Sequence, residues 1–363
     1  MKVALLGAGH IGQRIARLLH GSGDYQVTVF DQNARALAEL AGEGIATHAV
    51  GESLESIRPA VAGQQVIVNA LPYHLAIPAA QMALQAGCHY FDLTEDVAAT
   101  REIKSIAGGA RTLFMPQCGL APGFIGIVAH HLAQSFDTLQ EVKMRVGALP
   151  EFPTNALKYN LTWSVDGLIN EYCHPCEAIR DGRAIEVLPL EGLEHFSVDG
   201  IEYEAFNTSG GLGTLCETLE GRVRNLDYKT VRYPGHRNLM QFLLRELQLH
   251  SDQEMLKDIL RRSMPATMQD VVLVFVTVSG MKRGSFLQEV FARKIFAERA
   301  GERQLSAIQI TTAAGICAAV DLFRDGKLPQ SGFVAQEQVR LPDFLANRFG
   351  AAYERARQVE TIS

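Results

Sequence analysis

A glycine-rich turn near the start of the chain limits the fold more than any other feature. The apolar run of residues 1–6 leads into the turn Gly7–Gly12, and apolar residues then recur at helical spacing. A second apolar run, residues 27–30, ends on Asp31. A strand, a glycine-rich turn, a helix, a second strand and an acidic residue in this order predict a dinucleotide-binding βαβ unit.

Each part of this pattern has a physical task in holding a dinucleotide. Gly7 allows the tight turn, Gly9 leaves room for the pyrophosphate, and Gly12 lets the helix pack closely on the strand. The helix N-terminus presents free N–H groups and a partial positive charge to the phosphates. The Asp31 carboxylate can accept hydrogen bonds from both ribose hydroxyls and would repel a 2′-phosphate, so the pattern favours NAD over NADP. We therefore expect cofactor contacts from Gly7, Gly9, His10, Ile11, Gly12, Asp31, Asn69, Ala70, Leu71 and Pro72.

Length and composition exclude several classes of protein. A chain of 363 residues usually forms two domains. With 47% hydrophobic residues, 20% charged residues and a net charge of −6, it lacks the basic excess typical of proteins that bind nucleic acid or acidic membranes. Only four apolar residues separate Lys2 from the first glycine, which argues against a signal peptide, and no apolar run is expected to span a membrane. We expect a soluble cytoplasmic protein with a small-molecule partner.

The cysteines give no indication of a disulfide framework or a metal site. Six cysteines are scattered over the chain, as in a reduced cytosolic protein. Cys173 and Cys176 have CxxC spacing, but a second CxxC or a histidine pair at ligand spacing is missing. The sequence therefore predicts structural thiols and no metal.

The first third of the chain alternates between strand-like and helix-like segments. Strands are expected after the first two at residues 45–50, 65–70, 88–93 and 112–116, with helices at 34–41, 54–62, 76–86 and 97–107. This alternation predicts an α/β Rossmann domain with a doubly wound parallel sheet. Ligands of such sheets bind beyond the carboxyl ends of the strands. The loops that we expect there are 7–12, 71–74, 92–95 and 117–123, and Pro122 in the last of them is expected to open a helix that runs through Ala133.

The pattern changes near residue 140 to short extended segments separated by turn residues. Extended segments are expected at 142–146, 159–163, 184–188, 196–198, 203–205, 228–233 and 271–278. Asp199-Gly200 and residues 281–284 are hairpin signals, the latter before a strand at 285–296. A helix is expected at 239–248, a long apolar helix at 306–323, and a frayed tail from about 350. This predicts a second α+β domain, residues 126–305, on a mainly antiparallel sheet, with residues 306–345 rejoining the dinucleotide domain of residues 1–125.

Several stretches of the second domain carry more specific information than the glycine pattern. They are residues 157–164, which contain Thr162-Trp163-Ser164, and Arg232-Tyr233-Pro234-Gly235-His236. Together with Asn69-Ala70-Leu71-Pro72 and Gly119-Leu120-Ala121-Pro122-Gly123, they resemble the saccharopine dehydrogenase family, and within it most closely the lysine 6-dehydrogenase branch. The resemblance covers most of the chain.

This resemblance implies an NAD-dependent amine dehydrogenase that acts on L-lysine or a close diamino acid. Hydride would pass from C6 to NAD, and the imine would hydrolyse to ammonia and an aldehyde that cyclises to a piperideine carboxylate. Relatives that form saccharopine usually prefer NADP, and Asp31 stands where a serine or arginine is expected in them.

The reaction dictates which groups the site must contain. An ammonium with an unperturbed pKa of about 10.4 must lose its proton before hydride can leave, which requires a base or a dry pocket. The carboxylate of the substrate needs a cation, for which Arg232 is the candidate. Asp92 and Glu95 follow the fifth strand and are candidates to receive the amine or steer water.

Other candidates are less directly dictated by the chemistry. His236 and Tyr73 are alternative proton carriers, and Trp163 is a candidate wall against the lysine chain. The resemblance places Cys118 beside the nicotinamide and the substrate. Each has a structural alternative: Arg232 in a surface ion pair, Trp163 in the core, Asp92 as a helix cap, His236 and Tyr73 as residues that complete their turns.

Two other functions remain open at this point. A saccharopine-type reductase, which joins an amino acid to a carbonyl compound, would need a second carboxylate-binding group from Arg180, Arg183, Lys158 or Arg237. A non-catalytic NAD sensor would bind the cofactor without turnover, but the polar loops at Asp92 and Cys118 argue against it. The edges and one face of an antiparallel sheet commonly pair across a twofold axis, so we expect a homodimer or a multiple of it.

Overall fold

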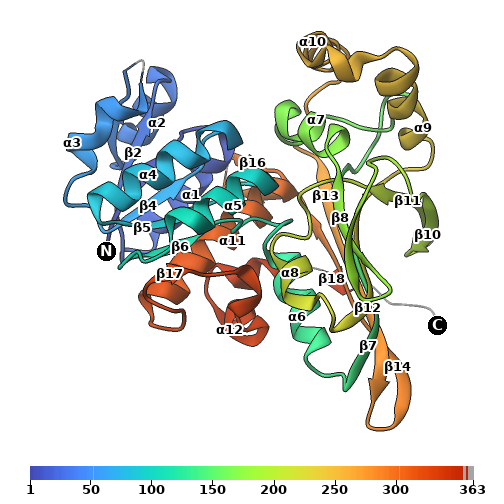
Figure 1. Ribbon diagram of the computed structural model, residues 1–363. Coiled ribbons are helices and arrows are strands. Elements are labelled where there is room, and N and C mark those ends of the chain that lie inside the picture. The colour runs from blue at the N-terminus through green and yellow to red at the C-terminus, as the bar shows by residue number, and fades with distance from the viewer. Residues whose placement is uncertain (52, 302, 355–356, 359–363) are drawn as a thin grey trace. The chain divides into compact units, whose positions relative to one another are not determined.

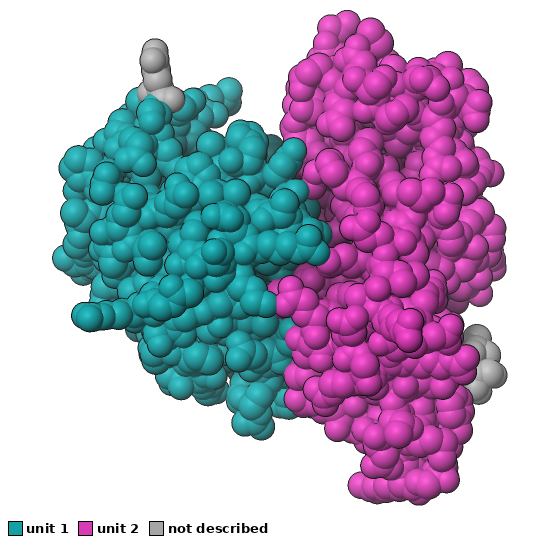
Figure 2. Space-filling view, viewed as in Figure 1, with its two compact units in different colours: residues 1–124, 309–354 teal, residues 125–308, 355–363 magenta. Residues whose placement is uncertain are grey.

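The computed structural model describes residues 1–51, 53–301, 303–354 and 357–358, and the chain forms two compact units. The first unit comprises residues 1–124 and 309–354, and the second comprises residues 125–308 and the end of the chain (Figure 2). The chain therefore leaves the first unit after Phe124 and returns to it at Gln309. Each unit has its own sheet and is described by itself.

The first unit is built on a seven-stranded sheet in which every pair of neighbours is parallel, as predicted (Figure 1). Its strand order is β17-β6-β5-β4-β1-β2-β3. Six strands lie close to the expected ranges, whereas β17 was not foreseen because it is only two residues long. The strands are β1 (Lys2–Leu6), β2 (Gln26–Asp31), β3 (Ala46–Ala49), β4 (Val66–Asn69), β5 (His89–Asp92), β6 (Leu113–Met115) and β17 (Gly332–Phe333).

Helices pack on this sheet along the chain and after its return. Residues of α3, α4 and α5 join the alternate sheet residues Ala4, Leu6 and Ile67 in one buried cluster. The segment expected as one helix at 54–62 is a 3₁₀ turn, Leu54–Ile57, followed by α3. The helices are α1 (His10–Gly21), α2 (Ala34–Gly42), α3 (Arg58–Val61), α4 (Ala76–Ala86), α5 (Val97–Ile106), α11 (Ala307–Arg324) and α12 (Leu341–Ala346).

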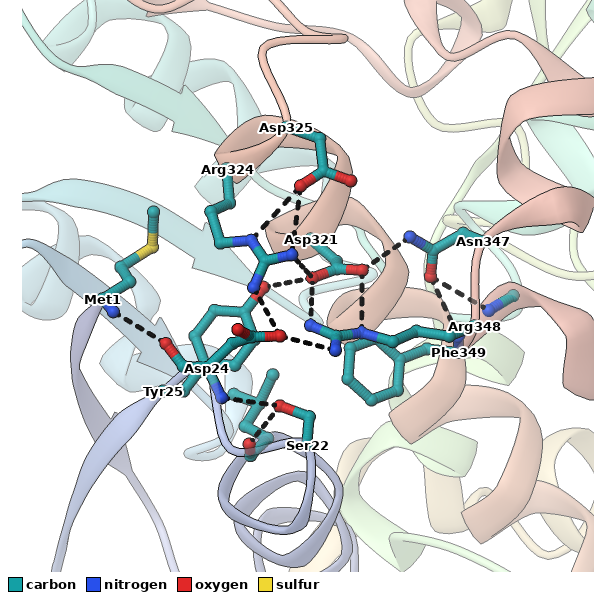
Figure 3. A network of polar contacts seen from close by, with 12 residues as sticks. Met1, Ser22, Asp24, Tyr25, Asp321, Arg324, Asp325, Asn347, Arg348 and Phe349 are labelled. Carbon is teal, nitrogen blue, oxygen red and sulfur yellow. Dashed lines mark hydrogen bonds and ion pairs between the residues drawn. The ribbon is translucent and has the colours of Figure 1, made fainter.

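A polar network fixes the returning segment to the start of the chain (Figure 3). The buried Asp321 carboxylate of α11 accepts hydrogen bonds from Tyr25 Oη, Asn347 Nδ2 and Arg348. Arg348 also pairs with Asp24, as does Arg324. These bonds lower the pKa of the Asp321 carboxyl. Residues 321–348 are thereby tied to the turn before β2.

The chain stays ordered beyond the point at which a frayed tail was expected. Residues Gly350–Tyr353 form a 3₁₀ turn, and Tyr353 is fully buried, with its ring stacked on Phe124 at 3.8 Å between centroids. The expectation of fraying from about 350 is wrong for these residues, because a single buried aromatic side chain holds them.

Helix α11 also differs from the expectation that no apolar run approaches a membrane span. It is the one helix among the described residues that is long and apolar enough to cross a membrane by length and composition. However, 83% of its apolar window is buried inside the protein, as is usual for a core helix.

The second unit contains a mixed, mainly antiparallel sheet of nine strands (Figure 1). The path β10-β11-β12-β7-β13-β14-β18 has one parallel pair, β12 with β7. Both predicted hairpin turns are present, and Asp199, Gly200, Arg283 and Gly284 have positive φ angles. The strands are β7 (Thr138–Pro150), β8 (Cys176–Arg180), β9 (Arg183–Val187), β10 (Glu194–Val198), β11 (Ile201–Asn207), β12 (Val223–Arg232), β13 (Asp270–Lys282), β14 (Ser285–Phe296) and β18 (Arg357–Gln358). A separate hairpin is formed by β15 (Glu298–Ala300) and β16 (Arg303–Leu305).

The helices of the second unit were predicted less well. Residues 159–163 are not a strand: Leu161 makes one isolated bridge to Ala266, and the segment packs in the helical cluster. Pro122 precedes its helix by two residues instead of opening it, and the helix expected at 239–248 consists of α9 followed by a π-helical turn, Phe242–Glu246. The helices are α6 (Phe124–Ala133), α7 (Val165–Cys173), α8 (Leu215–Leu219), α9 (His236–Gln241) and α10 (Gln253–Ser263).

Candidate active site

The glycine-rich turn after β1 has the geometry of a phosphate cradle. Gly7 has a φ of 102°, which favours glycine, and a Cβ atom there would lie 2.9 Å from the carbonyl oxygen of Ala70. A Cβ atom on Gly12 would lie 2.1 Å from the carbonyl oxygen of Gly7. A Cβ atom on Gly9 would meet nothing within 4 Å. The fold itself therefore requires glycine at 7 and 12, whereas the open space at Gly9 fits the close approach of a ligand.

Helix α1 begins directly after this open space. Gly9 is its N-cap residue and offers no side-chain cap, so the N–H groups of the first turn, from His10 and Ile11 onward, remain available to an anion. The loop after β4, residues 70–72, lies against the turn because β1 is bracketed by β2 and β4. The sheet order reverses here, which is where open parallel sheets bind their ligands. These residues fit a dinucleotide.

Asp31 ends β2, as predicted, and its carboxylate also holds two loops. One oxygen accepts the N–H of Ala8 and the other accepts the N–H of Asn33 at 2.7 Å. A carboxylate has about four lone-pair sites, so these bonds leave it able to accept ribose hydroxyls. Asp31 pairs with no cation among the described residues.

A buried network aligns the loops that follow β4, β5 and β6. Asn69 accepts the N–H of Leu71 and donates to Tyr90 Oη. Tyr90 Oη donates to Asp92 at 2.9 Å, and the other oxygen of Asp92 accepts the N–H groups of Thr94 and Gln117. Burial raises the pKa of the Asp92 carboxyl to about 6. Both oxygens of Asp92 are therefore engaged in holding loops in place.

Three acidic residues at the end of β5 and in the loop after it, Asp92, Glu95 and Asp96, have different surroundings. Asp96, and not Asp92, caps α5 by accepting the N–H of Ala99. Glu95 is half-buried, and its carboxyl is faced by its own backbone N–H but forms no ion pair or hydrogen bond with another residue in the described part of the chain. Burial raises the pKa of Glu95 to about 7, and the charges of Asp96 and Asp92 add to this rise. Glu95 thus has the free carboxyl that Asp92 lacks.

Cys118 lies in the predicted loop, but its thiol is only 1% exposed. The thiol donates to the carbonyl of Met115 and accepts from Gln336 Nε2 at 3.2 Å. Burial raises the pKa of the Cys118 thiol. This environment does not favour a proton-carrier role. The thiol helps to pack the loop beneath α11, where a Cβ atom on Gly315 would lie 2.7 Å from the carbonyl oxygen of Cys118.

Tyr73 begins the 3₁₀ turn Tyr73–Leu75 that follows β4, and its ring contacts that of His74 at 5.9 Å. It is partly exposed, and its hydroxyl has no hydrogen-bond partner within the described ranges. Tyr73 is therefore available for a ligand, and the structure adds no further evidence for its predicted role.

Arg232 ends β12 in the second unit and is 3% exposed, so it is not part of a surface ion pair. Its Nε donates to Tyr172 Oη at 3.0 Å, and Nη1 donates to the carbonyl of Val231 at 2.8 Å. Its guanidinium carbon lies 4.9 Å from the centroid of the Tyr159 ring and 5.8 Å from that of Tyr172. Among the residues described, no carboxylate forms an ion pair with it.

His236 begins α9 and is 1% exposed. Its Nδ1 lies 2.9 Å from the carbonyl oxygen of Leu157, and its Nε2 lies 3.1 Å from Tyr172 Oη. Burial, together with the charge of Arg232, lowers the pKa of His236 to about 3. The structure thus does not support the predicted role of proton carrier, since both ring nitrogens are engaged and the ring stays neutral.

Trp163 lies partly buried at the edge of the aromatic cluster around Arg232. Its Nε1 donates to Tyr159 Oη at 3.1 Å, and its ring packs against the cluster formed by α7, α9 and α10. Trp163 thus fits both alternatives given by the sequence, a core residue and a wall against the substrate, because its side chain is only partly buried.

The four cations proposed as a second carboxylate-binding group have separate surroundings. Arg180 lies 3.4 Å from Asp227 across β8 and β12, and Arg183 is exposed on β9. Arg237 donates to the carbonyl of Leu190. Lys158 is exposed, and its Nζ donates to the carbonyl of Pro234, two residues beyond Arg232. Lys158 thus bonds to the segment that follows β12, and Arg237 is itself part of that segment.

The CxxC pair follows the pattern of structural thiols. Cys173 and Cys176 are both free, and burial raises the pKa of the first to about 11 and that of the second to about 12. Within the described ranges, no three side chains of the metal-binding types are grouped closely enough to hold a metal ion.

Sequence reasoning missed two tyrosines that organise the site. Tyr90 links Asn69 to Asp92, and Tyr172 links Arg232 to His236. Both are fully buried, and a buried tyrosine hydroxyl usually has a partner. Tyr172 lies four residues after Leu168, on the buried face of α7, and this spacing is the signal that could have identified it.

Comparison with known families identifies the family of the chain. Residues 3–113 match the saccharopine dehydrogenase NADP binding domain, and residues 119–349 match the saccharopine dehydrogenase C-terminal domain. The chain belongs to the saccharopine dehydrogenase family. It is therefore an oxidoreductase of this family with a nicotinamide cofactor, which leaves the sensor alternative without support.

The individual relatives of this family member share little sequence identity with it. The mitochondrial alpha-aminoadipic semialdehyde synthases of Mus musculus and Bos taurus are 22% and 23% identical over 199 and 201 residues. These regions cover 51% and 52% of this chain but only 21% of either relative. The structure is similar to that of saccharopine dehydrogenase (L-Glu forming) from Saccharomyces cerevisiae, with a TM-score of 0.79, 16% identity and full coverage of both chains. That similarity confirms the predicted fold.

Proposed function

We propose that the chain catalyses the NAD-dependent oxidative deamination of the terminal amine of L-lysine or a close diamino acid. The observation that carries this proposal is Arg232, a buried guanidinium whose terminal nitrogens form no ion pair with a carboxylate among the described residues, although the charge of buried Glu171 helps to raise its pKa. A buried cation whose terminal N–H groups lack acceptors is costly, and such a cation usually serves an anion that binds there. The carboxylate of an amino acid has the right charge, and its two oxygens match a guanidinium.

The amine end of the substrate requires a proton acceptor. Glu95 is the best candidate, because its carboxyl is unengaged and a pKa of about 7 suits a general base near neutral pH. Asp92, whose oxygens hold the loops after β5 and β6, supports Glu95 by fixing the segment that carries it. Glu95 would take a proton from the ammonium, so that the nitrogen lone pair becomes free.

We assign NAD as the cofactor on the basis of Asp31 and the turn between β1 and α1. The N–H groups at the start of α1 would hold the pyrophosphate, and Asp31 would hold the ribose and repel a 2′-phosphate. When bound, NAD accepts the hydride that leaves the carbon beside the nitrogen. The overall reaction converts the ammonium substrate, NAD⁺ and water into an aldehyde, NADH, NH₄⁺ and H⁺. The aldehyde of lysine can then cyclise onto its own α-amine.

A second candidate is a saccharopine-type reductase that condenses an amino acid with a carbonyl compound. The position of Lys158 favours it, since this cation is anchored to Pro234, close in sequence to Arg232, and a condensation would require a second carboxylate-binding group. The names of the matching family models are in accord with such chemistry. Lys158 is exposed, and the four-carbon stem of a lysine is flexible, so we rank this candidate second.

One assay separates the two candidates. Purified protein is mixed with NAD or NADP and with L-lysine or L-ornithine at alkaline pH, and the absorbance of the reduced cofactor is followed. The proposal predicts that L-lysine reduces NAD without any added keto acid. Consumption of NADPH or NADH only when lysine and a keto acid are both present would establish the reductase instead.

A matched pair of variants tests the carrying observation in the same assay. Arg232→Met should lower kcat/KM for L-lysine by about a hundredfold or more, as expected for loss of a buried charge pair with the substrate. Arg180→Met removes a partly exposed arginine of the same unit and should leave kcat/KM within about twofold. Equal effects of the two substitutions would contradict the role of Arg232.

A further inference from the structure

A chain of three buried side chains determines how Arg232 is presented. Arg232 Nε donates to Tyr172 Oη, and Tyr172 Oη lies 3.1 Å from His236 Nε2. His236 Nδ1 faces the carbonyl oxygen of Leu157, which can only accept a hydrogen bond. Nδ1 must therefore carry the proton, and Nε2 of the neutral ring must accept the proton of Tyr172. The direction of every bond in the chain follows from this one carbonyl.

The direction of these bonds matters for the guanidinium. Because Tyr172 gives its proton to His236, its oxygen can offer only lone pairs to Arg232. It accepts from Nε and holds that side of the guanidinium, while Val231 takes one hydrogen of Nη1. The remaining hydrogens belong to the two terminal nitrogens, and none of them has a partner in the described part of the chain. These two nitrogens form an edge that fits both oxygens of one carboxylate.

The aromatic surroundings restrict the orientation further. The Tyr159 ring lies against the guanidinium, and the Tyr172 ring lies beside it. Tyr159 is itself held by Trp163, and His236 packs between Tyr159, Tyr172 and Phe206 at ring distances of 5.3, 6.0 and 6.3 Å. A purely structural arginine would normally satisfy most of its five N–H groups with protein acceptors. Arg232 uses two of them.

We propose that Tyr172 and His236 are positioning residues that make the Arg232 site specific for a substrate carboxylate, so that the enzyme discriminates amino acids from the corresponding decarboxylated amines. The activity assay for this inference rests on the proposed function, whereas the contacts from which we infer it do not. A neutral or cationic group in this place would leave the terminal N–H groups of the buried guanidinium without a charged acceptor. The selectivity therefore arises at the end of the substrate remote from the reacting amine.

The test compares L-lysine with cadaverine, which has the same reacting amine and no carboxylate. Tyr172→Phe keeps the ring and removes the acceptor of Nε. It should lower kcat/KM for L-lysine about tenfold to a hundredfold, mainly through KM, which is the range for a hydrogen bond to a charged group. The value for cadaverine should stay within about twofold. His236→Phe should shift the same ratio in the same direction, because the proton of Tyr172 loses its acceptor.

Tyr353→Phe is the matched control. It also removes one buried hydroxyl with a hydrogen bond, here to the carbonyl of Thr311, but it lies in the other unit. Its ratio of lysine to cadaverine should equal that of the wild type. A fall in activity toward both substrates by the same factor in Tyr172→Phe would show a general structural role and overturn the inference.

Binding measurements distinguish failure of this inference from failure of the proposed function. Calorimetric titration of the full chain with L-lysine, L-glutamate and cadaverine in the presence of NAD needs no turnover. If no amine is oxidised but a carboxylated ligand binds more tightly than cadaverine, and this preference is lost in Tyr172→Phe and in Arg232→Met, the inference holds and the proposed function fails. If neither carboxylated ligand binds better than cadaverine, the inference is overturned.

Discussion

A Cβ atom at residue 12 would lie 2.1 Å from the carbonyl oxygen of Gly7, whereas one at residue 9 would meet nothing within 4 Å. The turn between β1 and α1 therefore contains one glycine that the fold requires and one whose space is left free. This difference separates the stability of the turn from its binding function.

Two alanine substitutions should consequently behave in opposite ways. Gly12→Ala forces backbone atoms apart and should reduce the free energy of unfolding by about 1–3 kcal/mol or more. Gly9→Ala should cost no more than about 1 kcal/mol, because Gly9 has an ordinary φ of −66° and alanine is only a poorer N-cap than glycine. It should nevertheless weaken binding of NADH about tenfold or more, since the methyl group occupies the space of the pyrophosphate. Denaturant titration and NADH fluorescence titration measure the two quantities. Tight NADH binding by Gly9→Ala would contradict the proposed cradle.

Replacement of Asp31 should change cofactor discrimination. Asp31→Asn removes the charge but keeps an oxygen for one of the N–H groups of Ala8 and Asn33. The ratio of kcat/KM for NAD to that for NADP should fall about tenfold, which corresponds to about 1.4 kcal/mol of lost repulsion and lost ribose bonding. Asp31→Ser should lower the ratio in the same direction with a larger loss of stability. An unchanged ratio in both variants would remove the role that we assign to this carboxylate.

The acidic limb of the pH–rate profile should depend on Glu95. Its carboxyl must be ionised to accept a proton, so kcat/KM should rise as the pH increases through about 7. Glu95→Gln should lower kcat/KM by about a hundredfold and abolish this limb. Asp96→Asn, which changes the neighbouring helix cap, should keep the limb although it shifts stability. Persistence of the limb in Glu95→Gln would assign the base elsewhere.

The neutral state of His236 should make the protein sensitive to acid. The folded pKa of about 3 lies below the ordinary value of 6.5, so the stabilisation is fully present above pH 6.5 and is lost as the pH falls toward 3. Between pH 6.5 and pH 4, the wild type should lose roughly 3 kcal/mol more stability than His236→Gln does. His195→Gln, which replaces an exposed histidine on β10, should follow the wild type. Parallel pH curves for the wild type and His236→Gln would show that burial of this ring does not oppose its protonation.

Local patterns were sufficient to predict the first unit. Alternating apolar runs, the glycine turn and Asp31 are signals carried by neighbours in sequence, and the parallel sheet follows from them. The strand β17 could not be predicted, because two residues carry no periodicity and its pairing with β6 joins positions far apart in the chain. The buried Tyr353 was missed for the same reason: the rings that hold it come from residues 124 and 344.

The second unit shows where periodicity misleads. Residues 159–163 have the composition of a strand, yet Tyr159 is buried against Arg232 and His236 in a helical cluster. Single residues could be named as candidates from the sequence, but their surroundings depend on partners that the sequence does not place together. Arg232 could be chosen for its charge, whereas the lack of a close ion pair for it among the described residues is visible only once the chain is folded.

A crystal structure of the protein with NAD and L-lysine tests the central claim most directly. The account predicts that both carboxylate oxygens of lysine lie within hydrogen-bond distance of the terminal nitrogens of Arg232. A lysine carboxylate held by any other group, with Arg232 still unoccupied, would contradict it.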